Sequence, residues 1–128
     1  MSNVLPGLKY SKEHEWVKIE GNVAAIGISD HAQSQLGDIV FIELPKVGAS
    51  AQYMKAVGVV ESVKAASDIY SPVSGKIVAV NEQLTKTPES VNKDCYGTGW
   101  MVKIELSKPE ELNALMDDKA YTEFLAKH

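Results

Sequence analysis

The stretch Gly58–Gly75, GVVESVKAASDIYSPVSG, predicts two strands joined by a short turn. An apolar run stops at Lys64, two alanines follow, and an alternating run then leads through a proline to a glycine. Alternation of apolar with polar residues is typical of a strand with one buried face. We therefore expect a hairpin that presents a lysine at its turn.

Lys64 stands where a modifying enzyme can reach its amine. Ala65 and Ala66 follow it, so nothing bulky is expected beside the ammonium group. A lysine at a turn is usually a solvated charge, and the sequence shows neither a desolvating pocket nor a neighbouring cation that would activate it as a nucleophile. These features indicate an amine suited to being acylated rather than a catalytic one.

The chain before this hairpin is mostly of period two, which predicts a sheet protein. The dipeptide Gly21-Asn22 suits the turn between the first two expected strands. The alternation breaks after them, where Ser29 or Asp30 can cap a helix that Gly37 ends. Along the whole chain, the expected strands cover residues 15–20, 21–29, 38–45, 55–63, 67–73, 77–81 and 99–106.

The last third of the chain changes character twice. Residues 82–99 are polar and rich in turn residues, which predicts a long loop with a helical turn near Pro88–Val91. In the tail, Ser107 and Glu110 have the spacing of a capping box, and Asp117 can cap a second helix. The apolar residues of these two expected helices are Leu112, Leu115 and Met116 in the first, and Tyr121, Phe124 and Leu125 in the second. We expect the tail to pack its apolar stripe on the sheet.

The composition is that of an ordinary globular domain, with 128 residues, a hydrophobic fraction of 45% and a net charge of −4. The acidic balance argues against nonspecific nucleic acid binding, which needs a basic face. A single cysteine, Cys95, excludes an internal disulfide, and none of the three histidines has the spacing of a metal site, so no metal is predicted. We expect a monomer with one domain over residues 1–128, a core at about 8–106 and C-terminal helices at about 107–127.

The sequence gives no sign of a membrane segment. No apolar run reaches the length of a membrane span, and the opening segment MSNVLPGLKYSKEHEW has neither the apolar core of a signal peptide nor the arginines of a transit peptide. We expect a bacterial cytoplasmic protein, with the mature form of a mitochondrial protein as the second choice.

The segment ESVKAASDIYSPVSG resembles a lipoyl-attachment hairpin, and nearly the whole chain resembles the glycine cleavage system H protein family. The resemblance runs through GLKYSKEHEWVKIEG, VAAIGISDHAQSQLGDIVFIELP, VGVVESVKAASDIYSPVSGKIVAVN, YGTGWMVKI and the helical tail. It implies a mainly β, lipoyl/biotinyl-type barrel-sandwich hybrid fold with short helices and a C-terminal helical tail.

The resemblance also implies a role for several residues. Lys64 corresponds to the lysine that carries lipoic acid in amide linkage. Glu61 and Gly75 match positions that the attaching enzyme recognises. Glu15 and Asp68 would otherwise be interpreted as solvated charges. In the family they correspond to residues on the side of a cleft, and we expect them to contact the lysyl-lipoyl arm when it carries its aminomethyl group.

The implied function is that of a non-catalytic carrier in glycine catabolism and one-carbon metabolism. Such a carrier takes an aminomethyl group from glycine decarboxylase, a pyridoxal phosphate enzyme, to aminomethyltransferase, which uses tetrahydrofolate. Its dithiol is then reoxidised by dihydrolipoamide dehydrogenase, which uses FAD. The further partners are lipoate-attaching enzymes, and no nucleic acid or membrane partner is expected.

Two positions depart from the family pattern. Tyr53-Met54 stands where relatives usually have a glycine-containing turn, so the geometry of this turn is an open question. Cys95 stands where proline or serine is common, and a thiol near the arm would compete for a mixed disulfide, although we read it as an ordinary loop residue.

Four alternatives share part of this pattern. A lipoyl domain of a 2-oxo acid dehydrogenase has the hairpin but is usually shorter and lacks the EHEW segment and the two-helix tail. A biotin carrier normally flanks its lysine with methionine, whereas Val63 and Ala65 stand here. An enzyme that forms a Schiff base at Lys64 would need burial or a nearby cation to activate the amine. A relay donor that supplies lipoyl groups to other enzymes would show the same sequence features.

Overall fold

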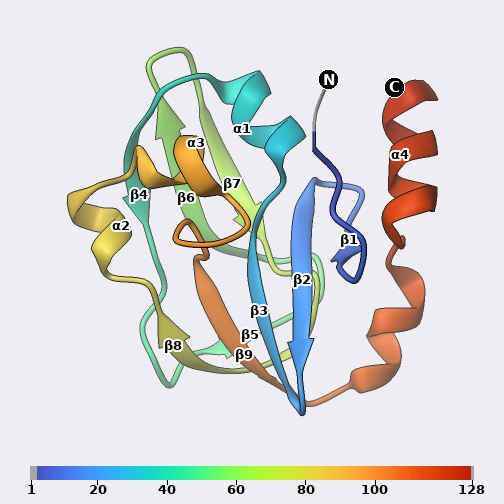
Figure 1. Cartoon of the computed structure of the whole chain (residues 1–128). Helices are drawn as coiled ribbons and strands as arrows, with labels where there is room; N and C mark the ends of the chain where they lie inside the picture. The colour runs from blue at the N-terminus through green and yellow to red at the C-terminus, as the bar shows by residue number, and fades with distance from the viewer. Residues whose placement is uncertain (1–2, 128) are drawn as a thin grey trace.

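The computed structural model describes residues 3–127 and contains two antiparallel sheets (Figure 1). The six-stranded sheet has the order β1-β2-β3-β9-β8-β5, and the three-stranded sheet has the order β4-β6-β7. The strands are β1 (Lys9–Tyr10), β2 (Glu15–Glu20), β3 (Val23–Ile28), β4 (Ile39–Glu43), β5 (Ser50–Ala51), β6 (Ala56–Ser62), β7 (Ala66–Tyr70), β8 (Gly75–Val80) and β9 (Val102–Leu106). The mainly β fold expected from the sequence is confirmed.

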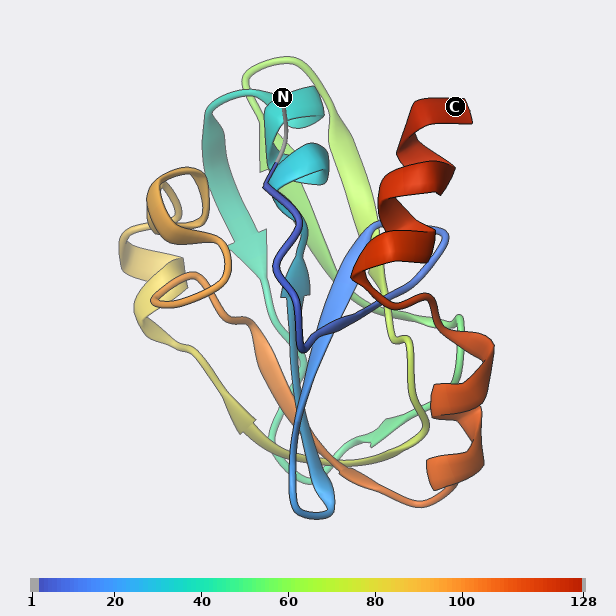
Figure 2. The ribbon, with the colours of Figure 1, turned by 45° about the vertical axis from the view of Figure 1, so that its right-hand side comes forward.

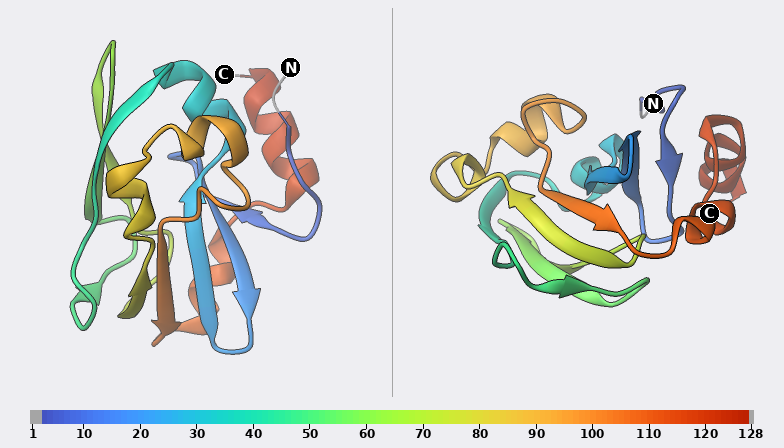
Figure 3. Two further views of the ribbon diagram at one scale, coloured as in Figure 1. Left: turned by 60° about the vertical axis from the view of Figure 1, so that its left-hand side comes forward. Right: turned by 90° about the horizontal axis from the view of Figure 1, so that it is seen from below.

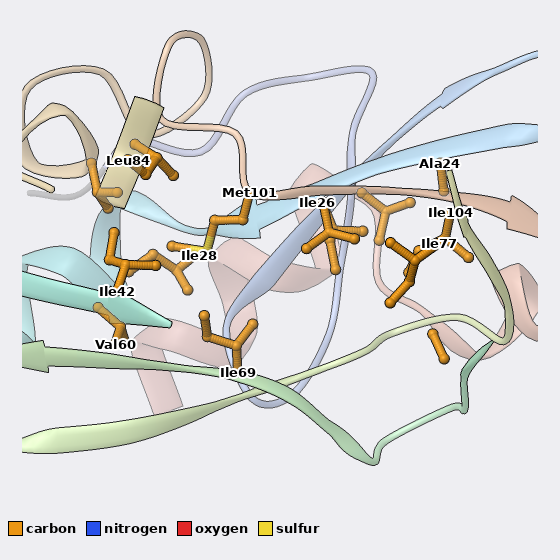
Figure 4. Packing of buried hydrophobic residues seen from close by; sticks show 14 of the residues in the cluster. Ala24, Ile26, Ile28, Ile42, Val60, Ile69, Ile77, Leu84, Met101 and Ile104 are labelled. Carbon is orange, nitrogen blue, oxygen red and sulfur yellow. The ribbon is translucent and has the colours of Figure 1, made fainter. Parts of the chain in front are cut away.

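The main core lies between the two sheets, because each strand turns its alternate apolar residues inward. Figure 3 shows β6 and β7 lying across from β8 and β9. The labelled core side chains that come from the six-stranded sheet are Ala24, Ile26, Ile28, Ile77 and Ile104, and those from the three-stranded sheet are Ile42, Val60 and Ile69 (Figure 4). These contacts hold the β6–β7 hairpin against a rigid base.

Helix α1 (Asp30–Leu36) begins and ends where the sequence predicts. The side chain of Ser29 caps it by accepting a hydrogen bond from the Ala32 N–H at 3.2 Å. Gly37 ends it with a φ of +81°, in the left-handed region that favours glycine. Of the two candidate caps, the side chain of Ser29 rather than that of Asp30 makes the capping bond.

The polar segment 82–99 contains more regular structure than expected. Helix α2 (Gln83–Lys86) was not predicted, and α3 (Ser90–Asp94) begins close to the expected helical turn. Leu84 and Val91 anchor these two short helices because their side chains are fully buried in the main core. Such short helices depend on packing rather than on propensity, so the sequence pattern alone is weak there.

The first part of the tail corrects a prediction. It is a 3₁₀ helix, η1 (Pro109–Ala114), which begins after Lys108 and has no side-chain cap, so the Ser107–Glu110 capping box does not form. Glu111 instead reaches to the neighbouring strand region, where it accepts hydrogen bonds from the Ser74 N–H at 2.6 Å and the Ser74 hydroxyl at 2.7 Å. The helix is therefore tied to the sheet by a glutamate outside the predicted capping box.

The second part of the tail confirms its prediction. Asp117 caps α4 (Asp118–Lys127) by accepting a hydrogen bond from the Ala120 N–H at 2.8 Å. The helix lies beside β1, at the edge of the six-stranded sheet (Figure 2). Its Tyr121 stacks on Tyr10 with ring centroids 4.4 Å apart, in a second small core that also contains Trp16.

The turn at Tyr53-Met54, which lacks the glycine expected there, keeps the positive φ that glycine usually adopts. Met54 has a φ of +60°, and the turn closes with a hydrogen bond of 3.0 Å from the Lys55 N–H to the Gln52 carbonyl. The Met54 N–H also donates to the Ser71 carbonyl at 2.6 Å. These two bonds hold methionine in a conformation that side chains rarely adopt.

Candidate functional site

Hydrogen bonds of Ser62 in the β6–β7 turn hold Lys64 at the tip of the hairpin. The Ser62 side chain accepts hydrogen bonds from the N–H groups of Lys64 and Ala65, both at 3.1 Å, and the Ser62 N–H donates to the Ala65 carbonyl at 2.8 Å. This turn forms one end of the molecule (Figure 1). The tip is therefore fixed by its own polar contacts, while the Lys64 side chain is exposed.

The stem of Lys64 lies over Gly37, at the end of α1. A Cβ atom at Gly37 would stand 3.1 Å from the lysine Cε and 3.8 Å from its Nζ, so glycine leaves room for the stem. The Val63 N–H also donates to the Asp38 carbonyl at 3.1 Å, which joins the tip to the chain that follows α1. No sequence pattern had predicted that Ser62 would hold the turn or that Gly37 would make room for the lysine stem.

A cleft of about 400 Å³ lies along α1, the helix whose end the lysine stem covers. Helix α1 forms one wall, the turn before β2 forms another, and β7 contributes one residue. The lining residues are Glu13, His14, His31, Ala32, Gln35, Leu36 and Ser67. Seven residues of α helix span about 10 Å, so a flexible group attached to Lys64 can fold back along this cleft.

Glu15 lies beneath the surface rather than in the cleft. Its side chain is 1% exposed and accepts a hydrogen bond of 2.5 Å from the Ser11 hydroxyl. Burial raises the pKa of this carboxyl to about 7, and hydrogen bonds from Ser11 and from the backbone of Tyr70 offset part of the burial effect. Near neutral pH, Glu15 therefore exists as a mixture of carboxylic acid and carboxylate.

The raised pKa of Glu15 makes the stability of the protein depend on pH. The folded protein disfavours the carboxylate, so stability should fall as pH rises from the ordinary pKa of 4.5 to about 7, with the full loss present above that. This shift corresponds to about 3 kcal/mol. Glu15→Gln has no charge to bury and keeps an acceptor for Ser11, so it should lack this pH dependence.

The measurement is urea unfolding of wild type and Glu15→Gln at about pH 5 and about pH 8. We expect the wild type to lose up to about 3 kcal/mol more than the variant over this interval. Glu20→Gln, at an exposed position of the same strand, is the control and should follow the wild type. Identical pH dependence in all three proteins would contradict the assignment.

Asp68 lies on a different strand from Glu15. It is exposed on β7, where neighbouring side chains point to opposite faces of the strand. Ser67 lines the cleft, so Asp68 points to the other face. The carboxylate that does line the cleft is Glu13, which no sequence motif had indicated.

Glu61 and Gly75 lie in different sheets. Glu61 is half-buried on β6, opposite Phe41 and Ala66, close to the tip that carries Lys64. Gly75 begins β8, and a Cβ atom there would stand 1.9 Å from the Glu105 carbonyl oxygen. Packing against β9 therefore explains the glycine, and recognition of either residue by an attaching enzyme stays a prediction.

The remaining reactive side chain is not positioned for redox chemistry. Cys95 is buried, and burial raises the pKa of its thiol to about 12, so it stays protonated and is a poor nucleophile. Its carbonyl accepts a hydrogen bond of 2.9 Å from the indole N–H of Trp16, a residue of the second small core.

The part of the chain from residue 3 to residue 127 lacks two further features. Within this range, no group of three or more His, Cys, Asp and Glu side chains has the arrangement of a metal site. The helices of the same range include none with both the length and the apolar character needed to cross a membrane.

Comparison with known proteins identifies the family. Residues 8–128 match the family model described as Glycine cleavage H-protein. The chain is 59% identical over 121 residues to the mitochondrial glycine cleavage system H protein of Flaveria trinervia, a match that covers 94% of this chain and 73% of that protein. It is 55% identical over 124 residues to the glycine cleavage system H protein of Symbiobacterium thermophilum, covering 97% of each.

A solved structure agrees with the fold. The crystal structure of a glycine cleavage system H protein from Mycobacterium marinum superposes with a TM-score of 0.83 at 32% sequence identity, covering 96% of this chain and 98% of that one. The sequence match and the shared fold extend over nearly the whole chain, including the β6–β7 hairpin and the tail. The chain belongs to the glycine cleavage H-protein family.

Proposed function

We propose that this protein is the lipoyl carrier of a glycine cleavage system, with lipoic acid attached to Lys64 through an amide bond. The observation that carries the proposal is the position of Lys64, exposed at a rigid tip and next to a cleft along α1. Family membership supports the same reading. Glu61, on the same hairpin, is proposed as a contact of the attaching enzyme.

The residues around Lys64 fit such a group. The Gly37 backbone leaves space for the lysine stem, and the cleft offers apolar contacts from Ala32 and Leu36 with polar groups at its rim. When bound, lipoic acid supplies a cyclic disulfide, strained because its ring prevents the roughly 85 to 100° dihedral that disulfides prefer, and this disulfide can accept the aminomethyl cargo. The hairpin keeps the attachment point fixed, while the arm supplies reach.

The proposed cycle requires other enzymes. Glycine decarboxylase loads the carrier, aminomethyltransferase unloads it, and dihydrolipoamide dehydrogenase restores the disulfide. We propose no catalytic residue in this chain. The contribution of this chain is to present the arm at a tip that the active site of each enzyme can receive. It also shelters the aminomethyl cargo while the carrier moves from one enzyme to the next.

Shelter in the cleft has a physical basis. The aminomethyl cargo is cationic near neutral pH, and a carboxylate within hydrogen-bond distance holds a cation through a charge-assisted bond. Glu13 lines the cleft, Glu15 lies below it, and Asp68 is exposed on the other face of β7. Glu13 is therefore the contact that the geometry favours, and Glu15 and Asp68 are the contacts that the family resemblance implies. Excluding water from the cargo slows its hydrolysis.

Neutralising the contact that holds the cargo should shorten the life of the loaded protein. With Glu13→Gln, Glu15→Gln or Asp68→Asn, release of ammonia and formaldehyde in the absence of tetrahydrofolate should quicken by up to roughly tenfold, the effect of losing about 1.4 kcal/mol. Lipoylation at Lys64 should be unchanged. The measurement is a time course from purified, aminomethyl-loaded protein.

Glu20→Gln, which removes an exposed carboxylate from β2, is the control and should decay like the wild type. The variant that quickens decay identifies the carboxylate that holds the cargo. Equal decay in wild type and all variants would show that these carboxylates do not protect it.

A further inference from the structure

We propose that the hydroxyl of Tyr121 is a positioning group that ties helix α4 to two walls of the cleft. Its oxygen lies 2.8 Å from His14 Nδ1 and 2.7 Å from the Ser29 hydroxyl. His14 lines the cleft on the turn before β2, and Ser29 caps the helix that forms the facing wall. One buried oxygen on the C-terminal helix therefore contacts both sides of the site.

The same two walls are also joined directly, so the hydroxyl completes a small closed network. The Ser29 N–H donates to the His14 carbonyl at 2.8 Å, and the Ala32 N–H donates to the Ser29 hydroxyl at 3.2 Å. Ala32 lines the cleft. A change at Tyr121 is thus transmitted through one side chain to the first turn of α1.

The hydroxyl is suited to this task because it stays neutral. Burial raises the pKa of Tyr121 to about 12, so the phenol keeps its proton at physiological pH. A neutral hydroxyl can donate one hydrogen bond and accept another, which matches its two neighbours, His14 and Ser29. A phenylalanine at this position would leave both without this partner.

The ring of Tyr121 is held independently of its oxygen. It stacks on Tyr10 with an interplanar angle of 1°, and its centroid lies 6.4 Å from that of Phe124. Tyr121→Phe keeps this apolar packing and removes only the oxygen. The helix should stay docked while the two walls lose their common contact.

The chain offers a matched control in the same aromatic stack. Tyr10 is as fully buried as Tyr121, and its hydroxyl also makes two hydrogen bonds, from the Leu5 N–H at 2.8 Å and to the Leu5 carbonyl at 2.9 Å. These bonds do not involve the residues that line the cleft. Tyr10→Phe therefore removes a buried hydroxyl from the same stack and leaves the bonds of Tyr121 to His14 and Ser29 intact. Its remaining link to α1 runs through Tyr96 to the Asp30 N–H, and not through the Ser29 hydroxyl that caps the helix.

The first test is amide hydrogen exchange of the unlipoylated protein, followed at the Ala32 and Gln33 N–H groups of α1. Tyr121→Phe should quicken exchange there by roughly three- to tenfold, while Tyr10→Phe should leave it close to the wild type. Equal exchange of these amides in the two variants would overturn the proposal. This test does not depend on lipoic acid.

The second test rests on the proposed carrier function. Aminomethyl-loaded Tyr121→Phe should release ammonia roughly two- to tenfold faster than loaded Tyr10→Phe, whereas reoxidation of the unloaded dithiol arm by dihydrolipoamide dehydrogenase should be equal in both. A general loss of stability would not make ammonia release differ between the two variants while dithiol reoxidation stays equal. Equal release in the two variants, from a wild type that does protect its cargo, would overturn the link to the arm.

The two tests also distinguish the failure of this inference from the failure of the proposed function. If the loaded wild type decays as fast as free aminomethyl-dihydrolipoamide, the cleft does not protect the cargo. The proposed link from Tyr121 to the arm is then wrong as well. The exchange comparison then still decides whether Tyr121 positions α1.

Discussion

Lys64→Arg is expected to abolish glycine cleavage while leaving the fold unchanged. Arginine keeps the positive charge and nearly the length of lysine, but its guanidinium does not form the amide that attaches lipoic acid. The side chain is exposed at a turn held by Ser62, so no core contact is lost. The variant should unfold at the wild-type temperature.

The measurement for Lys64→Arg is glycine cleavage in a mixture of this protein with glycine decarboxylase, aminomethyltransferase and dihydrolipoamide dehydrogenase. Lys55→Arg, another exposed lysine just before β6, is the control and should retain full activity. Activity in the Lys64→Arg mixture above that of a mixture without this protein would show that the arm is attached elsewhere or is not needed.

Gly75→Ser is expected to damage the fold before it affects recognition. A Cβ atom at this position would stand 1.9 Å from the Glu105 carbonyl oxygen and 2.8 Å from its carbon, so β8 and β9 must move apart. Gly75 pairs with Leu106 on that side and with Ala51 on the other. The loss of stability should be about 3 kcal/mol or more, with a fall of the thermal midpoint by roughly 10 °C.

This expectation differs from the sequence-based interpretation of Gly75 as a recognition residue. Thermal unfolding of Gly75→Ser beside Lys76→Ser, a change at the exposed neighbouring position of β8, separates the two. Lys76→Ser should unfold near the wild-type temperature. A Gly75→Ser protein with wild-type stability but slow lipoylation would contradict the packing explanation and support recognition.

The fold was largely predictable because alternation and turn residues act locally. The β6–β7 hairpin, the helix that Gly37 ends and the cap at Asp117 all follow from short-range chemistry. The first tail helix was mispredicted because it begins at Pro109, one residue later than the Ser107–Glu110 capping box requires, and is a 3₁₀ helix. Its contact with a distant segment, from Glu111 to Ser74, leaves no local signal in the sequence. The division into a single domain stays a prediction.

The site was predictable only where it is local in sequence. The exposed position of Lys64 at a turn follows from its own neighbours, and its proposed role follows from the family resemblance. By contrast, the space at Gly37, the cleft carboxylate of Glu13 and the contacts of Tyr121 join segments far apart in the chain. Neither hydrophobic periodicity nor a sequence motif indicates contacts between such distant segments. The burial of Glu15 was also not predictable, because a charged residue at the start of a strand is usually exposed to solvent.

The proposed function depends on Lys64 being the residue that bears the lipoyl group. The most direct test is the intact mass of wild type and Lys64→Arg after each is produced together with a lipoate-attaching enzyme and lipoic acid, followed by peptide mapping. We predict that wild type gains the mass of one lipoyl amide, located on the peptide that contains Lys64, and that Lys64→Arg gains none. An unmodified wild type in a preparation where a known lipoyl protein is fully modified, or a lipoyl group on another lysine, would contradict the account.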